Sequence, residues 1–194
     1  MSVLKDKFKV LLLEDNPADA KLIQIALQGA CDPAFELEWV RDTPDALKRV
    51  SEDGLDIILT DLNLPSSVGL ETLTSLQSRG GELPIVVLTG SYLETSLGRQ
   101  AVQKGAQDYL DKQTMDARIL PRVLAFAVER KAIERFQEEF LQNINHELRT
   151  PLTVASGYLR CVLDGEFGPL PAKQRRILDL VTRNVLYMTQ LVEE

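Results

Sequence analysis

The stretch Lys9-Val-Leu-Leu-Leu-Glu-Asp-Asn-Pro17 decides how the amino-terminal part of the chain folds. Its first half is apolar at consecutive positions, which predicts a strand over Lys9–Leu13 that is covered on both faces. Glu14 and Asp15 follow this strand directly, and Asp15-Asn16-Pro17 is a typical start for a helix. A strand covered on both faces and followed by a helix indicates a parallel sheet between helical layers.

The same alternation continues as far as residue 118. Short apolar runs predict strands, and amphipathic stretches with a period of 3.6 predict helices. The predicted strands are Lys9–Leu13, Phe35–Val40, Asp56–Thr60, Pro84–Thr89 and Asp108–Leu110. The predicted helices between them are Ala18–Gln28, Thr43–Ser51, Leu70–Ser78 and Leu93–Lys104. This order predicts a doubly wound α/β domain with five parallel strands.

Residues 119–194 have a different character. Neither Gly nor Pro occurs from Arg122 to Thr150, and Phe126, Ile133 and Phe140 recur every seven residues. This pattern predicts a long amphipathic helix with coiled-coil spacing, spanning roughly 40 Å over residues 122–150. A turn-rich segment at 164–171 precedes a second amphipathic helix, which would run from residue 172 to the end. Since nothing in the first domain could cover so long a stripe, we expect a helical hairpin that dimerises as a four-helix bundle.

Composition and charge narrow the function. The 194 residues are 44% hydrophobic and carry a formal net charge of −7. Residues 1–118 hold 12 Lys and Arg against 19 Asp and Glu, whereas the remainder holds ten of each, so we expect no nucleic-acid partner. No apolar run is long enough to cross a bilayer, and no signal peptide is evident. Cys31 and Cys161 lack metal or redox spacing, so we expect a cytoplasmic protein with reduced thiols.

Polar residues follow several predicted strands. Glu14 and Asp15 follow the first and Asp61 the third, at the edge of a doubly wound sheet where ligands bind. Three carboxylates there would repel one another unless a divalent cation intervened, and Mg²⁺ is the expected ion. Thr89 and Lys112, at the ends of the fourth and fifth strands, would complete a phosphoryl site. Each residue alone could be a cap, a turn residue or a surface lysine, but all five in this order favour a functional site.

Four segments carry a further signal. They are Leu12-Leu-Glu-Asp-Asn16, Thr60-Asp-Leu-Asn-Leu-Pro65 with Gly69, Leu88-Thr-Gly90 and Gly105-Ala-Gln-Asp-Tyr-Leu-Asp-Lys112. Through them, residues 8–118 resemble the receiver domain of two-component response regulators. The resemblance implies a flavodoxin-like sheet with strand order 2-1-3-4-5.

The resemblance also implies a metal site and a nucleophile. Asp61 would be the phosphoacceptor, and Glu14 and Asp15 would hold Mg²⁺ together with Asp61 and the backbone carbonyl of Asn63. Elementary chemistry agrees, because a carboxylate attacks phosphorus only when its charge is neutralised.

Three more residues receive roles from the same resemblance. Lys112 and Thr89 would bind oxygens of the phosphoryl group, and Tyr109 would change rotamer together with Thr89. The sequence departs from the family pattern at Gln113, where a proline usually follows the lysine.

His146 is the only histidine of the chain. At about 100° per residue it lies opposite the apolar stripe of its helix and faces water. A lone histidine on a helix is usually structural or merely solvated. An exposed imidazole is nevertheless a competent phosphorus nucleophile, and the neighbouring Glu147 can take its proton. Pro151 should bend or loosen the helix just after this residue.

The segment His146-Glu-Leu-Arg-Thr-Pro-Leu152 gives context to this histidine. It resembles the phosphoacceptor motif of the dimerisation and histidine phosphotransfer domain of sensor histidine kinases, over residues 136–194. The resemblance implies phosphorylation of His146, with Glu147 as its acid–base partner. Thr150 would orient water during dephosphorylation of a partner receiver. Such kinases use ATP through a further domain whose motifs do not occur here, so this chain alone should not phosphorylate itself.

We therefore expect a receiver domain at 1–118, a coiled-coil signalling helix at 119–139 continuous with the last receiver helix, and a phosphotransfer domain at 140–194. The expected protein is a hybrid histidine kinase whose receiver precedes the kinase core. Its partners would be a second copy of the chain, the ATP-binding domain of the same kinase, and a partner receiver or histidine phosphotransfer protein. Two alternatives stay open: a dimeric relay or adaptor without kinase activity, and a non-enzymatic dimerisation scaffold.

Overall fold

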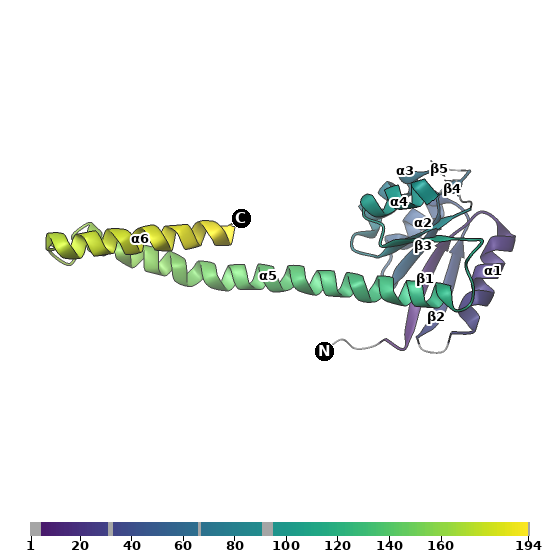
Figure 1. Cartoon of the computed structure of the whole chain (residues 1–194), viewed down its shortest axis with the longest axis horizontal. Helices are drawn as coiled ribbons and strands as arrows, with labels where there is room; N and C mark the ends of the chain where they lie inside the picture. The colour runs from purple at the N-terminus through teal and green to yellow at the C-terminus, as the bar shows by residue number, and fades with distance from the viewer. Residues whose placement is uncertain (1–4, 31–32, 66, 91–94, 194) are drawn as a thin grey trace. The chain divides into compact units, whose positions relative to one another are not determined.

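The computed structural model describes residues 5–30, 33–65, 67–90 and 95–193. It divides into two compact units, Met1–Ile133 and Glu134–Glu194. Each unit is built differently, one around a sheet and the other from helices alone (Figure 1). No helix in the described part of the chain is long and apolar enough to cross a membrane.

Five parallel strands form the sheet of the first unit (Figure 1). They are β1 (Lys7–Leu13), β2 (Ala34–Val40), β3 (Ile57–Asp61), β6 (Ile85–Thr89) and β7 (Asp108–Asp111), in the order β2-β1-β3-β6-β7. Counted along the chain within the sheet this is 2-1-3-4-5, so the predicted order is confirmed. A small antiparallel pair, β4 (Asn63–Leu64) and β5 (Ser67–Val68), was not predicted, because two-residue strands carry no periodic signal.

Helices follow the strands as the sequence pattern predicts. In the first unit they are α1 (Pro17–Gln28), α2 (Thr43–Val50), α3 (Leu70–Gly80) and α4 (Thr95–Gln103). The expected beginning of the last of these, at Leu93, lies outside the described residues, as does Cys31. Two longer helices follow, α5 (Ile119–Leu163) and α6 (Ala172–Glu193).

Both faces of the sheet are covered, which explains the consecutive apolar residues of its strands. Val10 and Leu12 pack with α1 and the start of α5, whereas Leu11 and Leu13 pack with α2, α3 and α4. Successive side chains of a strand point to opposite faces, so each strand supplies both layers of the core. The α5 residues in this core are Leu120, Leu124 and Ala127. Part of the segment expected as a connecting helix therefore packs against the sheet.

The helix α5 is longer than the predicted 122–150 and passes through Pro151 without a break. Proline has no N–H group, so the carbonyl of Glu147 loses its usual helical donor. Hydroxyl groups on both sides donate to carbonyls one turn back, from Thr150 to His146 at 3.4 Å and from Thr153 to Arg149 at 2.8 Å. These bonds show that the backbone remains helical around the proline.

The second unit is a helical hairpin in which α6 returns beside α5 (Figure 1). None of its described residues, 134–192, is fully buried. Half-buried positions such as Leu152, Leu159 and Val185 mark where the two helices meet. Large apolar side chains elsewhere on the hairpin are exposed, among them Phe136, Phe140, Leu141, Leu148, Tyr158, Val181, Met188 and Leu191. The hairpin alone thus leaves much of its apolar surface in water.

Candidate functional site

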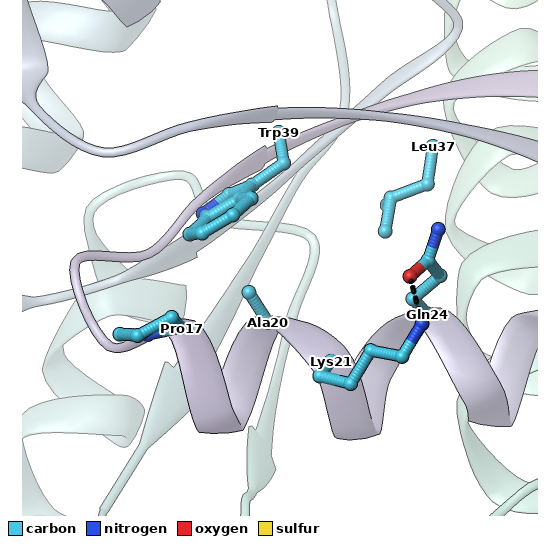
Figure 2. Close-up of a pocket in the computed structure, with 6 residues that line it drawn as sticks. All are labelled: Pro17, Ala20, Lys21, Gln24, Leu37 and Trp39. Carbon is cyan, nitrogen blue, oxygen red and sulfur yellow. Dashed lines mark hydrogen bonds between the residues drawn. The ribbon is translucent and has the colours of Figure 1, made fainter.

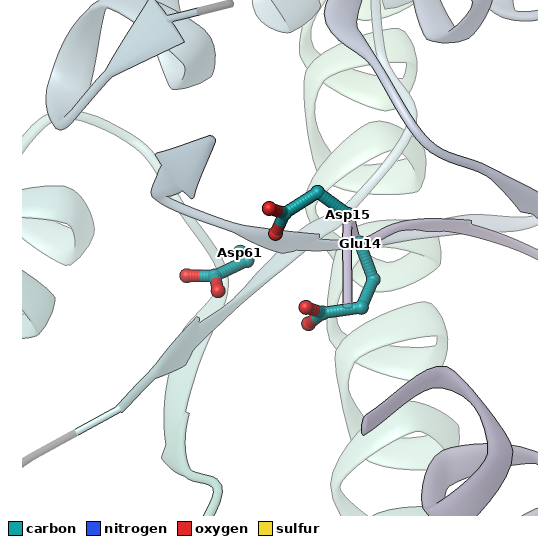
Figure 3. A group of neighbouring side chains, drawn as sticks. All are labelled: Glu14, Asp15 and Asp61. Atoms are coloured by element: carbon teal, nitrogen blue, oxygen red, sulfur yellow. The ribbon is translucent and has the colours of Figure 1, made fainter. Parts of the chain in front are cut away.

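Three carboxylates converge at the carboxyl edge of the sheet. Glu14 and Asp15 follow β1 directly, and Asp61 is the last residue of the adjacent β3. Their carboxyl groups lie near one another (Figure 3), and one oxygen of each is within 4.8 Å of the others. Glu14 is fully buried and Asp61 is 6% exposed, so water screens this cluster poorly.

The ammonium group of Lys112, just after β7, lies among these acids. Its Nζ atom is 2.7 Å from Oδ2 of Asp61 and 2.6 Å from Oε2 of Glu14. The backbone fixes its place, because the Lys112 N–H donates to the carbonyl of Thr89 at 2.9 Å. Burial lowers the pKa of Lys112, but its bonds to Asp61 and Glu14 outweigh burial and raise the pKa above the ordinary value. Lys112 is therefore a permanent cation within the cluster.

The donor set fits a hard divalent cation. Burial raises the pKa of Glu14 above its ordinary value, although the neighbouring Lys112 opposes this effect. Oε2 of Glu14 is buried, and the Lys112 ammonium at 2.6 Å is its partner among the described residues. Carboxylate oxygens gathered from three acids are the ligand chemistry that Mg²⁺ prefers. Glu14, Asp15 and Asp61 are thus placed to share such an ion.

A fourth carboxylate, Asp19, belongs to the same cluster and was missed by the sequence analysis. Its Oδ2 lies 3.0 Å from Nζ of Lys112. Asp19 stands in the first turn of α1, whereas Asp15 precedes the extended N-cap residue Asn16. The spacing of four residues between the two acids is therefore not a helical one, and it gave no signal that Asp19 reaches the site. The acids around Lys112 therefore come from β1, α1 and β3.

The remaining predicted residues of this unit surround the cluster. Thr89 ends β6 and is buried, and its hydroxyl donates to the carbonyl of Leu110 at 3.4 Å. Asn63 donates its backbone N–H to Oδ1 of Asp61 at 3.1 Å, while its carbonyl stays a predicted metal ligand. At the position where the family has proline, Gln113 donates its N–H to Oδ1 of Asp111 at 2.8 Å. Proline has no N–H group and could not donate this bond, so the turn after Lys112 differs here from a turn that contains the family's proline.

Tyr109 on β7 is half-buried against the layer of α2, α3 and α4. Its ring lies on the backbone of Gly98 in α4, where an added Cβ atom would come within 2.5 Å of the ring atom Cδ2. The tyrosine can occupy this place because residue 98 has no side chain.

The second predicted site lies on α5. His146, Glu147 and Thr150 are all exposed, as expected for a histidine that faces away from the apolar stripe. His146 and Thr150 are one helical turn apart and share a face of the helix. Within the described part of the chain, the imidazole of His146 forms no ion pair and no side-chain hydrogen bond. The chain thus carries two separate candidate sites, an enclosed acidic one and an open imidazole.

Two family models match the chain. One, the response regulator receiver domain, covers residues 10–124, and the other, the His Kinase A (phospho-acceptor) domain, covers residues 136–194. Among curated proteins, the swarming motility regulation protein RssB of Serratia marcescens is 35% identical over 116 residues, 60% of this chain and 51% of that protein. The chain therefore spans about half the length of this relative. The DNA-binding response regulator MtrA of Mycolicibacterium smegmatis is 27% identical over 92% of this chain and 75% of MtrA.

Solved structures agree with these matches. A sensor protein from Polaromonas sp. JS666 is 26% identical, with a TM-score of 0.56 over 64% of this chain and 98% of that one. The receiver domain of a sensor histidine kinase from Pseudomonas aeruginosa, whose structure has a magnesium ion in the active site cleft, is 27% identical, with a TM-score of 0.54 over 63% of this chain and 98% of that domain. The chain belongs to the response regulator receiver family through residues 10–124 and continues into a His Kinase A phospho-acceptor domain at 136–194, the domain order of a hybrid histidine kinase.

Proposed function

We propose that this chain carries phosphoryl groups on Asp61 and His146 in two-component signalling, and that the receiver regulates a histidine kinase core. The observation that carries the proposal is the ion pair of Asp61 with Lys112 at 2.7 Å, inside a cluster of acids at the sheet edge. Burying several carboxylates together lowers the stability of the fold, so such a cluster favours a functional role in binding a cation and a phosphoryl group. The two matched domains indicate phosphoryl transfer in two-component signalling, and the positions of Asp61 and His146 support the roles proposed for them.

At the receiver, an oxygen of Asp61 attacks the phosphorus of a phosphohistidine. A P–O bond forms, the P–N bond breaks, and the electron pair of that bond stays on the imidazole nitrogen of the donor. Lys112 lies close enough to Asp61 to offset the negative charge that accumulates on the phosphoryl oxygens. The Thr89 hydroxyl, which bonds weakly to Leu110, is free to turn toward a phosphoryl oxygen. Mg²⁺ held by Glu14, Asp15 and Asp61 would supply further neutralisation of charge at the reacting oxygens.

At the bundle, the imidazole of His146 attacks the γ-phosphorus of ATP held by the ATP-binding domain of the kinase. The P–N bond forms, the bond to ADP breaks, and Glu147 takes the imidazole proton. Thr150 would orient water when the domain dephosphorylates a partner receiver. The exposure of all three side chains supports this assignment, because a second protein domain must reach them.

The hairpin would act as a homodimer. Exposed apolar residues such as Phe136 and Phe140 lie on a helix that has no fully buried residue in the described part of the second unit. A four-helix bundle of two hairpins would bury them. We expect the dimer to act in the cytoplasm, with a partner receiver or a histidine phosphotransfer protein as its substrate.

Transfer of labelled phosphate tests these roles. The full chain is mixed with radiolabelled ATP and a separately prepared ATP-binding domain of a histidine kinase. We expect label on the chain, loss of label from the bundle in His146→Gln, and loss of label from the receiver in Asp61→Asn. Gln142→Glu, on an exposed polar residue one helical turn before His146, serves as the control and should keep its label. Label that stays on the bundle in His146→Gln, or on the receiver in Asp61→Asn, would contradict the proposal.

A relay or adaptor module is the second candidate. It differs from the first in the origin of the phosphate, which would come only from another phosphorylated histidine protein. If ATP with the added domain leaves His146 unlabelled, while a phosphohistidine donor labels Asp61, the relay is the better description.

Regulation through α5 is part of the proposal. The helix begins at Ile119, packs into the core of the first unit through Leu120, and extends past His146. A change of its rotation or pairing after phosphorylation of Asp61 would reach the second site as a two-state switch. Inserting one to four residues beside Glu134 should change kinase output with the period of a helix, about 3.6 residues. An output that does not depend on the number of inserted residues would exclude this route.

A further inference from the structure

Backbone pairing between β1 and β2 ends just before the acidic pair. The paired residues finish at Leu13 and Val40, and one more backbone bond joins Glu14 N to Val40 O at 3.1 Å. The carbonyl groups of Glu14 and Asp15 lie beyond this ladder. The main chain at this point must stay fixed, because three carboxylates have to be held close together against their mutual repulsion.

Two side chains from the end of β2 bind these two carbonyl groups. The indole Nε1 of Trp39 donates to Glu14 O at 2.8 Å, and Nη2 of Arg41 donates to Asp15 O at 3.3 Å. Trp39 and Arg41 are two residues apart in an extended segment, so both reach the same side. The guanidinium of Arg41 also lies 5.7 Å from the centre of the Trp39 ring, within the range of a cation–π contact. We call this pair the β2 clamp.

Core packing does not account for the place of the indole. Trp39 is 42% exposed, and its ring lines a small cleft of about 120 Å³ over α1 together with Pro17, Ala20 and Leu37 (Figure 2). A half-exposed indole could give its N–H to water at little cost. Here the N–H is given to the main chain of a residue in the acidic cluster. The hydrogen bond, rather than enclosure, therefore sets the orientation of the ring relative to Glu14.

We propose that Trp39 and Arg41 are positioning residues for the divalent cation site. They extend the β1–β2 ladder by two carbonyl groups and so hold the Glu14–Asp15 main chain where its carboxylates meet Asp61. Neither side chain bonds to a carboxylate of the cluster. The inference rests on the proposed function, because that function requires Mg²⁺ at these three acids.

Titration of Mg²⁺ into the metal-free full chain tests the proposal. Trp39→Phe keeps an aromatic ring and removes only the N–H donor, so its Mg²⁺ dissociation constant should rise about fivefold, the size of one lost hydrogen bond. Arg41→Gln should give a rise of about twofold, because its bond is longer and exposed. Glu36→Gln is the matched control on β2, since Glu36 pairs only with Lys7 at 2.8 Å among the contacts described for its side chain. It should bind Mg²⁺ like the unmodified chain.

A second measurement separates positioning from a general effect on stability. Phosphorylation of Asp61 by acetyl phosphate is followed at increasing Mg²⁺ concentration. In Trp39→Phe we expect the half-saturating Mg²⁺ concentration to rise about fivefold, with an unchanged rate at saturating Mg²⁺. If Trp39→Phe does not fold, the exposed Arg41→Gln decides the same question.

The outcomes are distinguishable. Unchanged Mg²⁺ binding in both clamp variants, or an equal loss in Glu36→Gln, overturns the clamp and leaves the proposed function standing. A loss of thermal stability in EDTA without a change in Mg²⁺ affinity also overturns it. Absence of Mg²⁺ binding in the unmodified chain contradicts the proposed function itself.

Discussion

The two proposed phosphoryl sites of the chain, one in each unit, are built in opposite ways. The first unit encloses its acids: Glu14 is fully buried, Asp61 nearly so, and Lys112 is bonded to both. The second unit leaves His146 open on the surface of a hairpin whose described residues are at most half-buried. A receiver must shape the reaction around its own nucleophile, whereas a histidine that meets several partner domains must stay accessible. The enclosed cluster takes its acids and its lysine from one chain, whereas the proposed role of His146 requires the surfaces of other domains.

The largest effect should come from charging the apolar face of the hairpin. Phe140 is 53% exposed, and its ring stacks on that of Phe136 at a centroid distance of 6.1 Å. Phe140→Glu would place a charge from each copy in the expected dimer interface, so the dimer dissociation constant should rise at least about 100-fold. Analytical ultracentrifugation measures this change. Gln137→Glu, an exposed polar position of the same helix, is the control, and equal association of both variants would remove the basis for the dimer.

The next effect concerns the proline inside α5. Pro151→Ala restores an N–H donor to the carbonyl of Glu147 and should stabilise the hairpin by about 1–3 kcal/mol. Thermal unfolding followed by circular dichroism reports the gain. Pro171→Ala is the matched control, because Pro171 lies just before α6 and interrupts no helical bond. If the two variants have the same stability, the helix around residue 151 is not limited by its missing donor.

A smaller effect should distinguish the enclosed site in the absence of metal. Burial raises the pKa of Glu14 above its ordinary value of 4.5. Its contribution to stability is therefore fully present below pH 4.5 and is lost as the pH rises through the raised native pKa. Glu14→Gln should accordingly unfold with a free energy about 1–2 kcal/mol larger than that of the unmodified chain at neutral pH, and with no gain near pH 4.

Urea unfolding at several pH values, with EDTA present, measures this difference. The same variant should lose the stabilisation that added Mg²⁺ gives the unmodified chain, about 2.7 kcal/mol at 100 times the dissociation constant. Greater stability of the unmodified chain at neutral pH without metal would show that burial of this acid carries no cost.

The smallest effect belongs to an ion pair outside both sites. Arg49 of α2 bonds to Glu38 of β2, with Nη2 3.0 Å from Oε1. This bond lowers the pKa of Glu38, so its stabilisation is present above pH 4.5 and is lost as the pH falls through the lowered native pKa. Glu38→Gln should cost about 0.5–1 kcal/mol at neutral pH in a urea titration. Glu52→Gln should cost less, because Glu52 is well exposed and its carboxylate lies 3.9 Å from the same arginine, a longer contact. If Glu52→Gln costs more than Glu38→Gln, this assignment is wrong.

The same comparison explains what the sequence could reveal. Consecutive apolar residues, as in Val10–Leu13, predicted a doubly covered strand, and their recurrence between amphipathic stretches predicted a doubly wound parallel sheet. The order of its strands was implied only by the resemblance to receiver domains. The acids at strand ends could be expected to meet because neighbouring parallel strands end at one edge. Their metal and phosphoryl roles remain predictions.

Other features depend on contacts that no local pattern encodes. Asp19 reaches Lys112 although 93 residues separate them, because the first turn of α1 lies beside the sheet edge. Nothing in the sequence marks Trp39 as a neighbour of the acids, and only its bond to Glu14 O connects it with the site. Leu120 and Leu124 lie roughly 120–160° around the helix from the stripe that contains Phe126. That stripe predicted the surface expected to meet a second chain, and it gave no sign of the residues that pack on the sheet.

Because the ring of Tyr109 lies on Gly98, the size of residue 98 decides which conformations the tyrosine side chain can adopt. A single methyl group at position 98 leaves no space for the ring on α4, since the new carbon would lie 2.5 Å from Cδ2. The ring would then have to leave its place on α4, whether or not Asp61 is phosphorylated. A chain with alanine at that position would therefore offer Tyr109 fewer rotamers, and the rotamer change expected of Tyr109 together with Thr89 could not start from the contact described here.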